Sequence, residues 1–231
     1  MKRSEINRII KEGIELLTAN NISLPEFAYW TWDQWKEHKD EIYNIKKVML
    51  GWDVFDYDLG DFEGCGGVLF TLRNGHPKDD TVGTPYCEKV IIMRHERGQY
   101  LLMHFHRVKT EDIINRCGGV MTIQLYNATE DDRLDLESPV NVHIDGIMHT
   151  FPAGSIIEIP KGSSITLTPN LFHKFGAKQG SGDIVIGEVS SVNDDTTDNV
   201  FLEPTTRFIP IEEDEEIIFP LCNEYYRLFE E

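Results

Sequence analysis

Residues 98–118 read Gly98-Gln-Tyr-Leu-Leu-Met-His104-Phe-His106-Arg-Val-Lys109-Thr-Glu111-Asp-Ile-Ile-Asn-Arg-Cys-Gly118. His104 and His106 are two positions apart, and on a β-strand this spacing directs both side chains to one face. Glu111 follows five residues later, where a turn or the start of the next strand can return its carboxylate to that face. Two imidazoles and a carboxylate suit a borderline or harder divalent cation. The stretch therefore predicts most of a metal site within a β fold.

A third imidazole can be sought downstream, where residues 151–173 have the pattern of strand, turn and strand. Gly154-Ser-Ile-Ile-Glu-Ile-Pro160-Lys-Gly162 leads into Ser-Ser-Ile-Thr-Leu-Thr-Pro-Asn-Leu-Phe-His173. The Pro160-Lys-Gly162 segment is typical of a turn between two apolar strands. His173 is therefore the candidate for the remaining histidine ligand.

The surrounding sequence predicts a mainly β chain. From Val68 onward, short apolar runs alternate with Gly, Asp, Asn and Pro, which is the rhythm of an antiparallel barrel or jelly roll. We expect one domain. Residues 1–60 should form a helical extension packed on the barrel, and residues 61–231 should form the barrel together with its C-terminal tail. The acidic run Glu212–Glu216 is expected to be a solvated stretch.

Two helices are expected near the N-terminus. Ser4 is a candidate cap for a helix that runs to about Ala19, with apolar residues along one face. Thr31-Trp-Asp-Gln34 has the form of a capping box, which predicts a second helix running toward Val48.

Composition limits the class of protein. A chain of 231 residues with 40% hydrophobic content can bury a sizeable core. Its formal net charge of −18 argues against a nucleic-acid partner, because such binding depends on clustered Lys and Arg. The first residues lack the apolar core of a signal peptide, and no run approaches the roughly 18 apolar residues of a membrane span. We therefore expect a cytoplasmic protein without a membrane partner, whose 4 cysteines are reduced thiols.

The two histidine-bearing segments resemble the paired motifs of the cupin superfamily. The first motif is Gly, five residues, His-x-His, four residues, Glu, six residues and Gly, and residues 98–118 match it at every spacing. The second is Gly, five residues, Pro-x-Gly and a later His. Here it departs from the pattern, because ten residues instead of two separate Gly162 from His173 and Ala177 stands where Asn is common.

The resemblance extends further, to the D-lyxose isomerase family of cupin sugar isomerases. It is carried by Lys109-x-Glu111, the late imidazole, Gly187-Glu188-Val-Ser-Ser191 and Asn199-Val-Phe-Leu-Glu203-Pro204 with Arg207. The likeness covers nearly the whole chain. It implies a cupin-type antiparallel β-barrel and a Mn²⁺-dependent aldose–ketose isomerase. Such an enzyme would be a homodimer interconverting D-lyxose and D-xylulose, and also D-mannose and D-fructose; Zn²⁺, Co²⁺ or Fe²⁺ are further candidate metals.

Carried over residue by residue, the resemblance assigns the metal to His104, His106, Glu111 and His173. Lys109 and Glu203 become the acid/base candidates, whereas Arg207 and Glu188 are candidates for binding substrate. Moving a carbonyl between C1 and C2 requires proton transfer through a cis-enediol whose oxygens gain negative charge. A hydride shift between the two carbons would use the metal in the same way and leave Glu203 to relay an oxygen-bound proton.

Other interpretations stay open at this point. Lys109 could be a solvated turn lysine, Arg207 could pair with an acid, and Glu188 could be a structural partner of a buried base or of a ligand histidine. At the level of function, an Fe²⁺-dependent cupin oxygenase would share the metal residues but gives no reason for Lys109. A non-catalytic sugar-binding cupin would need no open coordination positions.

Overall fold

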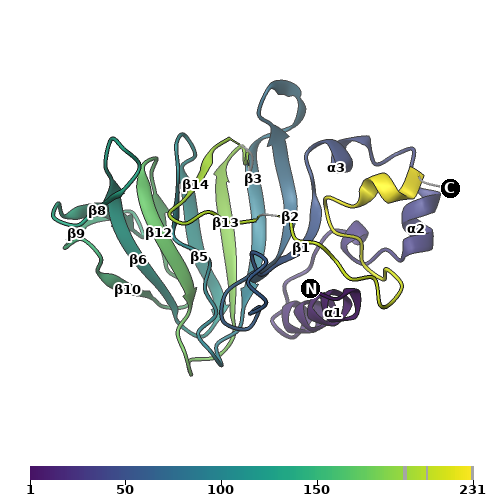
Figure 1. The fold of residues 1–231 in the computed structure, drawn as a ribbon, viewed down its shortest axis with the longest axis horizontal. Coiled ribbons are helices and arrows are strands. Elements are labelled where there is room, and N and C mark those ends of the chain that lie inside the picture. The colour runs from purple at the N-terminus through teal and green to yellow at the C-terminus, as the bar shows by residue number, and fades with distance from the viewer. Residues whose placement is uncertain (195–196, 207, 230–231) are drawn as a thin grey trace.

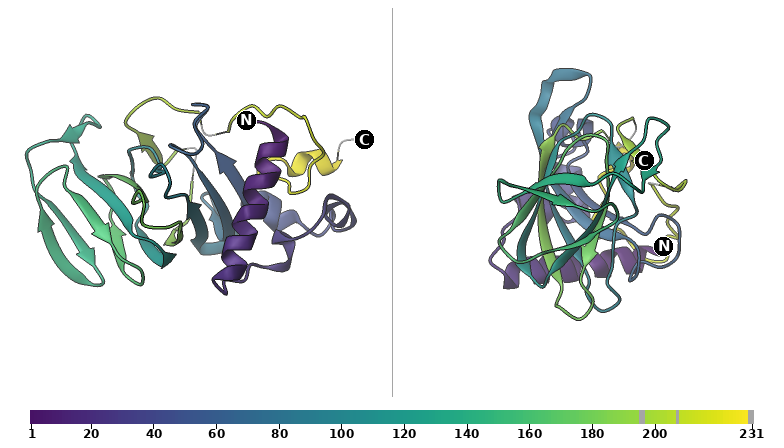
Figure 2. Two further views of the ribbon diagram at one scale, coloured as in Figure 1. Left: turned by 90° about the horizontal axis from the view of Figure 1, so that it is seen from below. Right: turned by 90° about the vertical axis from the view of Figure 1, so that its left-hand side faces the viewer.

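The molecule consists of two antiparallel sheets that face each other, with helices gathered at one end (Figure 1). The structure is a computed structural model that describes residues 1–194, 197–206 and 208–229. Seen from the end remote from the helices, the sheets curve around a common interior (Figure 2). The prediction of a mainly β, antiparallel cupin-type barrel with an N-terminal helical extension is confirmed.

Each sheet is antiparallel throughout. The eight-stranded sheet has the order β1 (Gly51–Phe55), β2 (Gly67–His76), β3 (Asp79–Met93), β13 (Ile184–Ser191), β5 (Glu111–Gly118), β11 (Ser164–Leu167), β8 (Val140–Ile144) and β9 (Ile147–Phe151). The six-stranded sheet has the order β10 (Ile156–Ile159), β6 (Met121–Ala128), β12 (Leu171–Ala177), β4 (His104–His106) and β14 (Asn199–Phe201), with β7 (Leu134–Asp135) paired to β6. Strands distant in sequence thus become neighbours, which is how the two motif segments meet.

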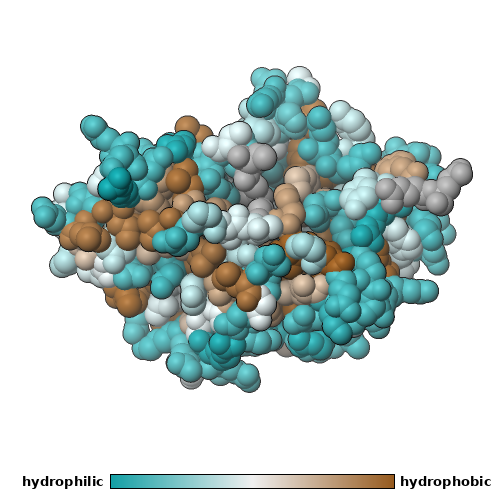
Figure 3. Space-filling view, viewed as in Figure 1, coloured by the Kyte–Doolittle hydropathy of each residue, from teal (hydrophilic) through white to brown (hydrophobic). Residues whose placement is uncertain are grey.

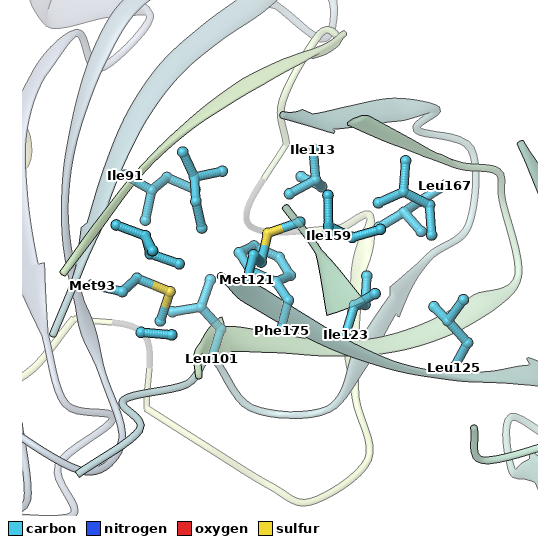
Figure 4. Close-up of a cluster of buried hydrophobic side chains, with 14 of the residues drawn as sticks. Ile91, Met93, Leu101, Ile113, Met121, Ile123, Leu125, Ile159, Leu167 and Phe175 are labelled. Carbon is cyan, nitrogen blue, oxygen red and sulfur yellow. The ribbon is translucent and has the colours of Figure 1, made fainter. Parts of the chain in front are cut away.

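The barrel interior is apolar at its centre. Along β5 every second residue is buried, so Glu111 and Ile113 point inward on successive turns of the pleat. Figure 4 shows Ile113 and Ile91 of the larger sheet meeting Met121 and Phe175 of the smaller one. This packing fixes the strands whose ends carry the polar residues described below.

The first and last residues of the first motif are glycines because the backbone has a positive φ at both positions. Gly98 has φ 67° and Gly118 has φ 93°, values that side chains other than glycine rarely adopt. At Gly118 a Cβ atom would lie 1.9 Å from the carbonyl oxygen of Asp183. The motif spacing therefore reflects two turns at the ends of the histidine-bearing segment.

Helix α1 (Arg3–Ala19) packs across the outer face of the larger sheet, next to β1 and β2 (Figure 2). The prediction that Ser4 caps this helix is wrong. Lys2 occupies the cap position and its own side chain makes no capping bond, whereas Ser4 donates through its backbone N–H (2.9 Å) and its hydroxyl (2.7 Å) to Asp214. A carboxylate from the C-terminal segment thus satisfies a backbone donor in the first turn.

The C-terminal acidic run is exposed, as expected, but at least three of its residues have fixed partners, among them Glu215, which accepts from Asn7 Nδ2 at 3.0 Å. Besides Asp214, Glu213 accepts a hydrogen bond from Arg3 Nε at 2.8 Å. The Arg3 guanidinium is fully buried and also donates to Glu224, at 3.0 Å from its Nη1. The beginning and the end of the chain are therefore joined by a buried ion-pair cluster.

The second predicted helix is split into α2 (Trp32–Glu37) and α3 (Tyr43–Lys47), which follow η1 (Glu26–Ala28). The Thr31 capping box is present, with the Thr31 side chain accepting from the backbone of Gln34. A continuous helix would place His38 and Lys39 on the face that buries Trp35, and neither is apolar. The chain therefore turns after Glu37. Trp35 packs beside η2 (Tyr225–Phe229) at the C-terminal end.

The face drawn in Figure 3 carries an apolar area at its left end, over the strands remote from the helices. The exposed apolar side chains of those strands and their loops are Leu136, Ile147, Met148 and Ile156. Elsewhere on this face most of the surface is hydrophilic. Within the described ranges, no helix combines the length and apolar character needed to cross a bilayer.

Candidate metal centre and active site

Two adjacent strands bring the three predicted histidines together. His104 and His106 lie on β4, and His173 on β12 is paired directly with His104 across the strands. The Nδ1 atoms of His104 and His173 are 2.7 and 2.9 Å from the backbone carbonyl oxygens of Leu102 and Leu171. Because a carbonyl only accepts, each Nδ1 carries the proton and each Nε2 keeps a lone pair.

These lone pairs converge on one point. The Nε2 atoms of His104 and His173 are 3.1 Å apart, which is unfavourable for two lone pairs unless a cation or proton lies between them. One ligand atom from each of His104, His106 and His173 lies within 4.8 Å of the others. The arrangement is therefore that of a cation site, since neutral imidazoles have no other reason to face each other in this way.

Glu111, the first residue of β5, adds an oxygen to the cluster. Its Oε1 atom is 3.3 Å from His106 Nε2 and 3.2 Å from His173 Nε2. Both His106 Nε2 and Glu111 Oε1 are buried and lack a hydrogen-bond partner among the described residues. Buried polar atoms without partners are costly, and a divalent cation satisfies both at once. The residues present thus fit a metal ion held by three imidazoles and one carboxylate.

The electrostatic environment keeps these groups in their ligating forms. Burial lowers the pKa of His104 well below its ordinary value, and the neighbouring His173 and His106 lower it further. Burial likewise lowers the pKa of His106. For Glu111, burial alone would raise the pKa, but the Lys109 ammonium and His106 outweigh it and hold the pKa well below the usual range. At neutral pH His104 and His106 are therefore neutral imidazoles and Glu111 is a carboxylate, the forms that bind a metal ion.

Lys109 lies beside this cluster and is buried. Its Nζ is 2.8 Å from Glu111 Oε2, the oxygen that does not face the histidines. It also lies 3.1 Å from Glu188 Oε1 and 3.4 Å from Asn193 Oδ1. Glu111 therefore offers one oxygen to the cation position and the other to an ammonium group.

A second lysine completes the network. Lys89 on β3 donates to Glu188 Oε1 at 2.9 Å and to Asn193 Oδ1 at 3.0 Å, so the two ammonium groups share the same acceptors. Burial would raise the pKa of Glu188, but Lys109 and Lys89 lower it below its usual value. Glu188 is thus an ionised carboxylate paired with two lysines, not a hydrogen-bond partner of a ligand histidine.

The loop that carries Lys109 is held by Asp198. The Asp198 carboxylate accepts from the backbone N–H groups of Val108 at 2.8 Å and of Lys109 at 3.2 Å. Its Oδ2 is also 3.8 Å from His106 Nδ1. A single buried carboxylate thereby fixes the loop between the last β4 histidine and Glu111.

One predicted residue, Glu203, is not part of this cluster. Glu203 follows β14, is exposed and does not line the cavity at the histidines, although Phe201 two residues earlier stacks on His104 with ring centroids 5.2 Å apart. Arg207 lies outside the described residues. His104, His106, Lys109, Glu111 and Glu188 all line one cavity.

Sequence reasoning missed Lys89, Asn193 and Asp198. A signal for Lys89 existed, because a lysine directly before the apolar run Val90-Ile-Ile-Met has to reach a buried partner or solvent. Asn193 and Asp198 follow strand β13 in a loop, where polar residues are common and give no such signal.

Comparison with known proteins places this site in a family. A family model described as D-lyxose isomerase matches residues 1–225. The chain belongs to the D-lyxose isomerase family. A D-lyxose/D-mannose isomerase of Serratia proteamaculans is 42% identical over 231 residues, covering 98% of this chain and 99% of that protein. One of the same name from Escherichia coli O157:H7 is 42% identical over 229 residues, covering 97% and 98%.

Solved structures with the same fold include L-ribose isomerases. That of Geodermatophilus obscurus is 17% identical with a TM-score of 0.52, covering 87% of this chain and 92% of its own. The Cellulomonas parahominis L-ribose isomerase with L-psicose is 16% identical with a TM-score of 0.50, covering 87% and 92%. At these identities the likeness concerns the fold.

Proposed function

We propose that this protein is a metal-dependent aldose–ketose isomerase that interconverts D-lyxose and D-xylulose, and D-mannose and D-fructose. The observation that carries the proposal is the placement of the buried Lys109 ammonium on the free oxygen of Glu111. A proton donor is thus fixed beside a cluster of three imidazoles and a carboxylate. The substrates named are those of the relatives at 42% identity.

Each residue of the site has a separate role in moving the sugar carbonyl between C1 and C2. His104, His106, Glu111 and His173 hold the cation, which when bound supplies Lewis-acid stabilisation of negative charge on the sugar oxygens. Lys109 Nζ donates a hydrogen bond or a proton to the oxygen at C1 or C2. Glu188 and Asn193 hold Lys109 in place. Leu101 and Phe175 contribute to the apolar part of the cavity wall.

Glu203 is proposed as the group that exchanges the carbon-bound proton. Its support is the family resemblance and its position in the sequence, two residues after Phe201, whose ring stacks on His104. If the reaction instead proceeds by hydride shift, the same carboxylate relays a proton between the sugar oxygens. Turnover in D₂O distinguishes the two routes, because proton transfer introduces deuterium at the reacting carbon and a hydride shift does not.

Two properties are added from the family resemblance. We propose Mn²⁺ as the native metal, since the mix of imidazole and carboxylate suits it, with Zn²⁺, Co²⁺ and Fe²⁺ as alternatives. We also propose a homodimer. Metal analysis of the purified protein and light scattering after size exclusion test these two points.

The test of the function is an anaerobic assay. The protein is stripped with a chelator, reloaded with Mn²⁺ and incubated with D-lyxose or D-mannose, and the ketose is measured. We expect D-xylulose and D-fructose from the reloaded protein and neither from the stripped one. Loss of the sugar to an oxidised product, without ketose and only when oxygen is admitted, would favour the oxygenase, and sugar binding without any product would favour the non-catalytic alternative.

A further inference from the structure

The cavity at the histidines is too small for the proposed substrates. Its volume is about 60 Å³. Since a single water needs about 10–15 Å³ on this measure, the cavity has room for only a handful of water-sized groups. That is fewer than the carbon and oxygen atoms of a five-carbon sugar. The part of the sugar remote from the reacting carbons therefore needs additional space.

A second cavity adjoins the first. It has a volume of about 390 Å³, and Leu69, Lys89 and Asn193 line both. Its other walls include three buried polar residues, Asp53 on β1 and Thr71 and Asn74 on β2. We call this second cavity the inner pocket. Its carboxylate, hydroxyl, amide and ammonium groups are of the kinds that hydrogen-bond sugar hydroxyls.

The register of the strands connects the two cavities by a row of polar side chains. Thr71 on β2 is paired with Lys89 on β3, and Lys89 is paired with Glu188 on β13. Residues paired in this way have Cα atoms about 4.5–5.5 Å apart, and their side chains share one face. Glu188 in turn contacts Lys109, which contacts Glu111. The row therefore leads from the metal cluster into the inner pocket.

Thr71 contributes the hydroxyl group of this row. It is only 5% exposed and lines the inner pocket. Its hydroxyl makes no hydrogen bond to any residue that the structure describes, whereas Asn74 is held by the backbone of Asn193 and Val48. This hydroxyl is not among the fully enclosed polar atoms without partners, so it is open to the inner pocket and can hydrogen-bond a ligand there.

We infer that the inner pocket binds the end of the open-chain sugar that is remote from the reacting carbons, and that Thr71 hydrogen-bonds the terminal hydroxyl of a hexose. The inference rests on the proposed function, because it takes the reacting carbons to lie at the histidines. A hexose extends one carbon farther along the row than a pentose does. Thr71 is therefore a residue that determines preference for chain length.

The experiment compares Thr71→Val with the unchanged protein. Valine keeps the branched shape and removes the hydroxyl. We expect kcat/KM for D-mannose to fall about three- to tenfold, the effect of one lost hydrogen bond, and to fall less for D-lyxose. Calorimetry gives a readout without turnover: the affinity for D-mannitol should fall more than that for D-arabinitol, the unreactive alditols of the two sugars.

Two further variants sharpen the test. Thr71→Ser restores a hydroxyl and should recover the preference for the hexose. Thr122→Val is the matched control, because Thr122 is a half-buried strand threonine on β6 that does not line the inner pocket. It should leave the ratio of the two sugars unchanged. Thermal melts of all three variants show that each is folded.

The outcomes separate the two proposals. If the unchanged protein isomerises both sugars and Thr71→Val lowers both equally or neither, the inference about the inner pocket is wrong and the proposed function stands. If the unchanged protein isomerises neither sugar, the proposed function fails, and the alditol affinities still decide the inference. Equal loss of affinity for both alditols would overturn it.

Discussion

Replacing Lys109 by methionine should separate proton donation from metal binding. Methionine fills much of the same space but removes the ammonium group that contacts Glu111 Oε2 at 2.8 Å and Glu188 Oε1 at 3.1 Å. Glu188 keeps its contact with Lys89, so Glu111 is the carboxylate that loses its cationic partner. Breaking a buried ion pair from one side costs about 3–5 kcal/mol. We expect that cost in the metal-free protein.

The same change should strengthen metal binding. In the unchanged protein the ammonium and a bound cation would be two positive neighbours of the Glu111 carboxylate, and at an effective dielectric of about 20 two unit charges 4 Å apart repel by about 4 kcal/mol. Removing this repulsion raises the metal affinity, but part of the gain is offset because Lys109 also orients the Glu111 carboxylate. We therefore expect the affinity for Mn²⁺ to rise at least about tenfold, while kcat falls about 10²–10⁴-fold because the proton donor is gone.

Three measurements check this reasoning. Calorimetric melting of the metal-free protein should show a fall in Tm of roughly 6–20 °C, at about 2–4 °C per kcal/mol for a chain of this size. Titration with Mn²⁺ gives the affinity, and initial rates with D-lyxose at saturating metal give kcat. Lys178→Met is the matched control, since Lys178 pairs with Glu158 on the surface and should change stability by less than about 1 kcal/mol.

The result that would refute the reasoning is weaker metal binding in Lys109→Met together with a rate restored by excess Mn²⁺. Lys109 would then act only by orienting a metal ligand. A full rate with unchanged metal affinity would remove it from the site altogether.

Four further changes test other parts of the molecule. Glu203→Gln should keep bound metal and lower turnover about 10²–10⁴-fold, and a near-normal rate would assign proton transfer to another group. His173→Ala should lose bound metal on gel filtration while circular dichroism stays unchanged, with exposed His143→Ala as the control; retained metal would contradict its role as a ligand. Burial holds the pKa of His104 well below 6.5 in the folded protein. As the pH falls below 6.5, His104 therefore takes up a proton in the unfolded chain but not in the folded one. The metal-free protein should thus lose up to about 1.4 kcal/mol of stability per pH unit below pH 6.5, and urea unfolding of His104→Gln should show a weaker dependence. Arg3→Met should cost about 3–5 kcal/mol in urea unfolding, and a loss under 1 kcal/mol would mean that Glu213 and Glu224 tolerate its absence.

The local parts of the site could be predicted from the sequence because they depend on strand geometry. The two-residue spacing of His104 and His106 requires a common face on any strand, and Glu111 begins the very next strand. His173 was harder, because its segment departs from the second motif. It reaches the cluster because its strand pairs with β4, directly opposite His104.

Other parts depend on pairings that spacing does not encode. Lys89 and Glu188 are 99 positions apart and meet only because β3 and β13 are neighbours in the sheet. The sequence alone therefore did not decide whether Glu188 binds substrate, pairs with a buried base or contacts a ligand histidine. Ser4 was assigned to a cap by its position at the start of a helix, whereas its partner Asp214 lies 210 residues away. The second helix was extended too far because the capping box predicts where a helix begins and not where it ends.

The buried Arg3 has a consequence for how the chain matures on the ribosome. Its partners Glu213 and Glu224 are 210 and 221 residues later, so they are synthesised long after α1. Until they emerge, docking α1 on the sheet would bury a guanidinium without its counter-ions, which is unfavourable. Helix α1 therefore docks stably only after Glu213 and Glu224 have been synthesised, and a nascent chain stalled before them would leave the apolar face of α1 open to chaperones.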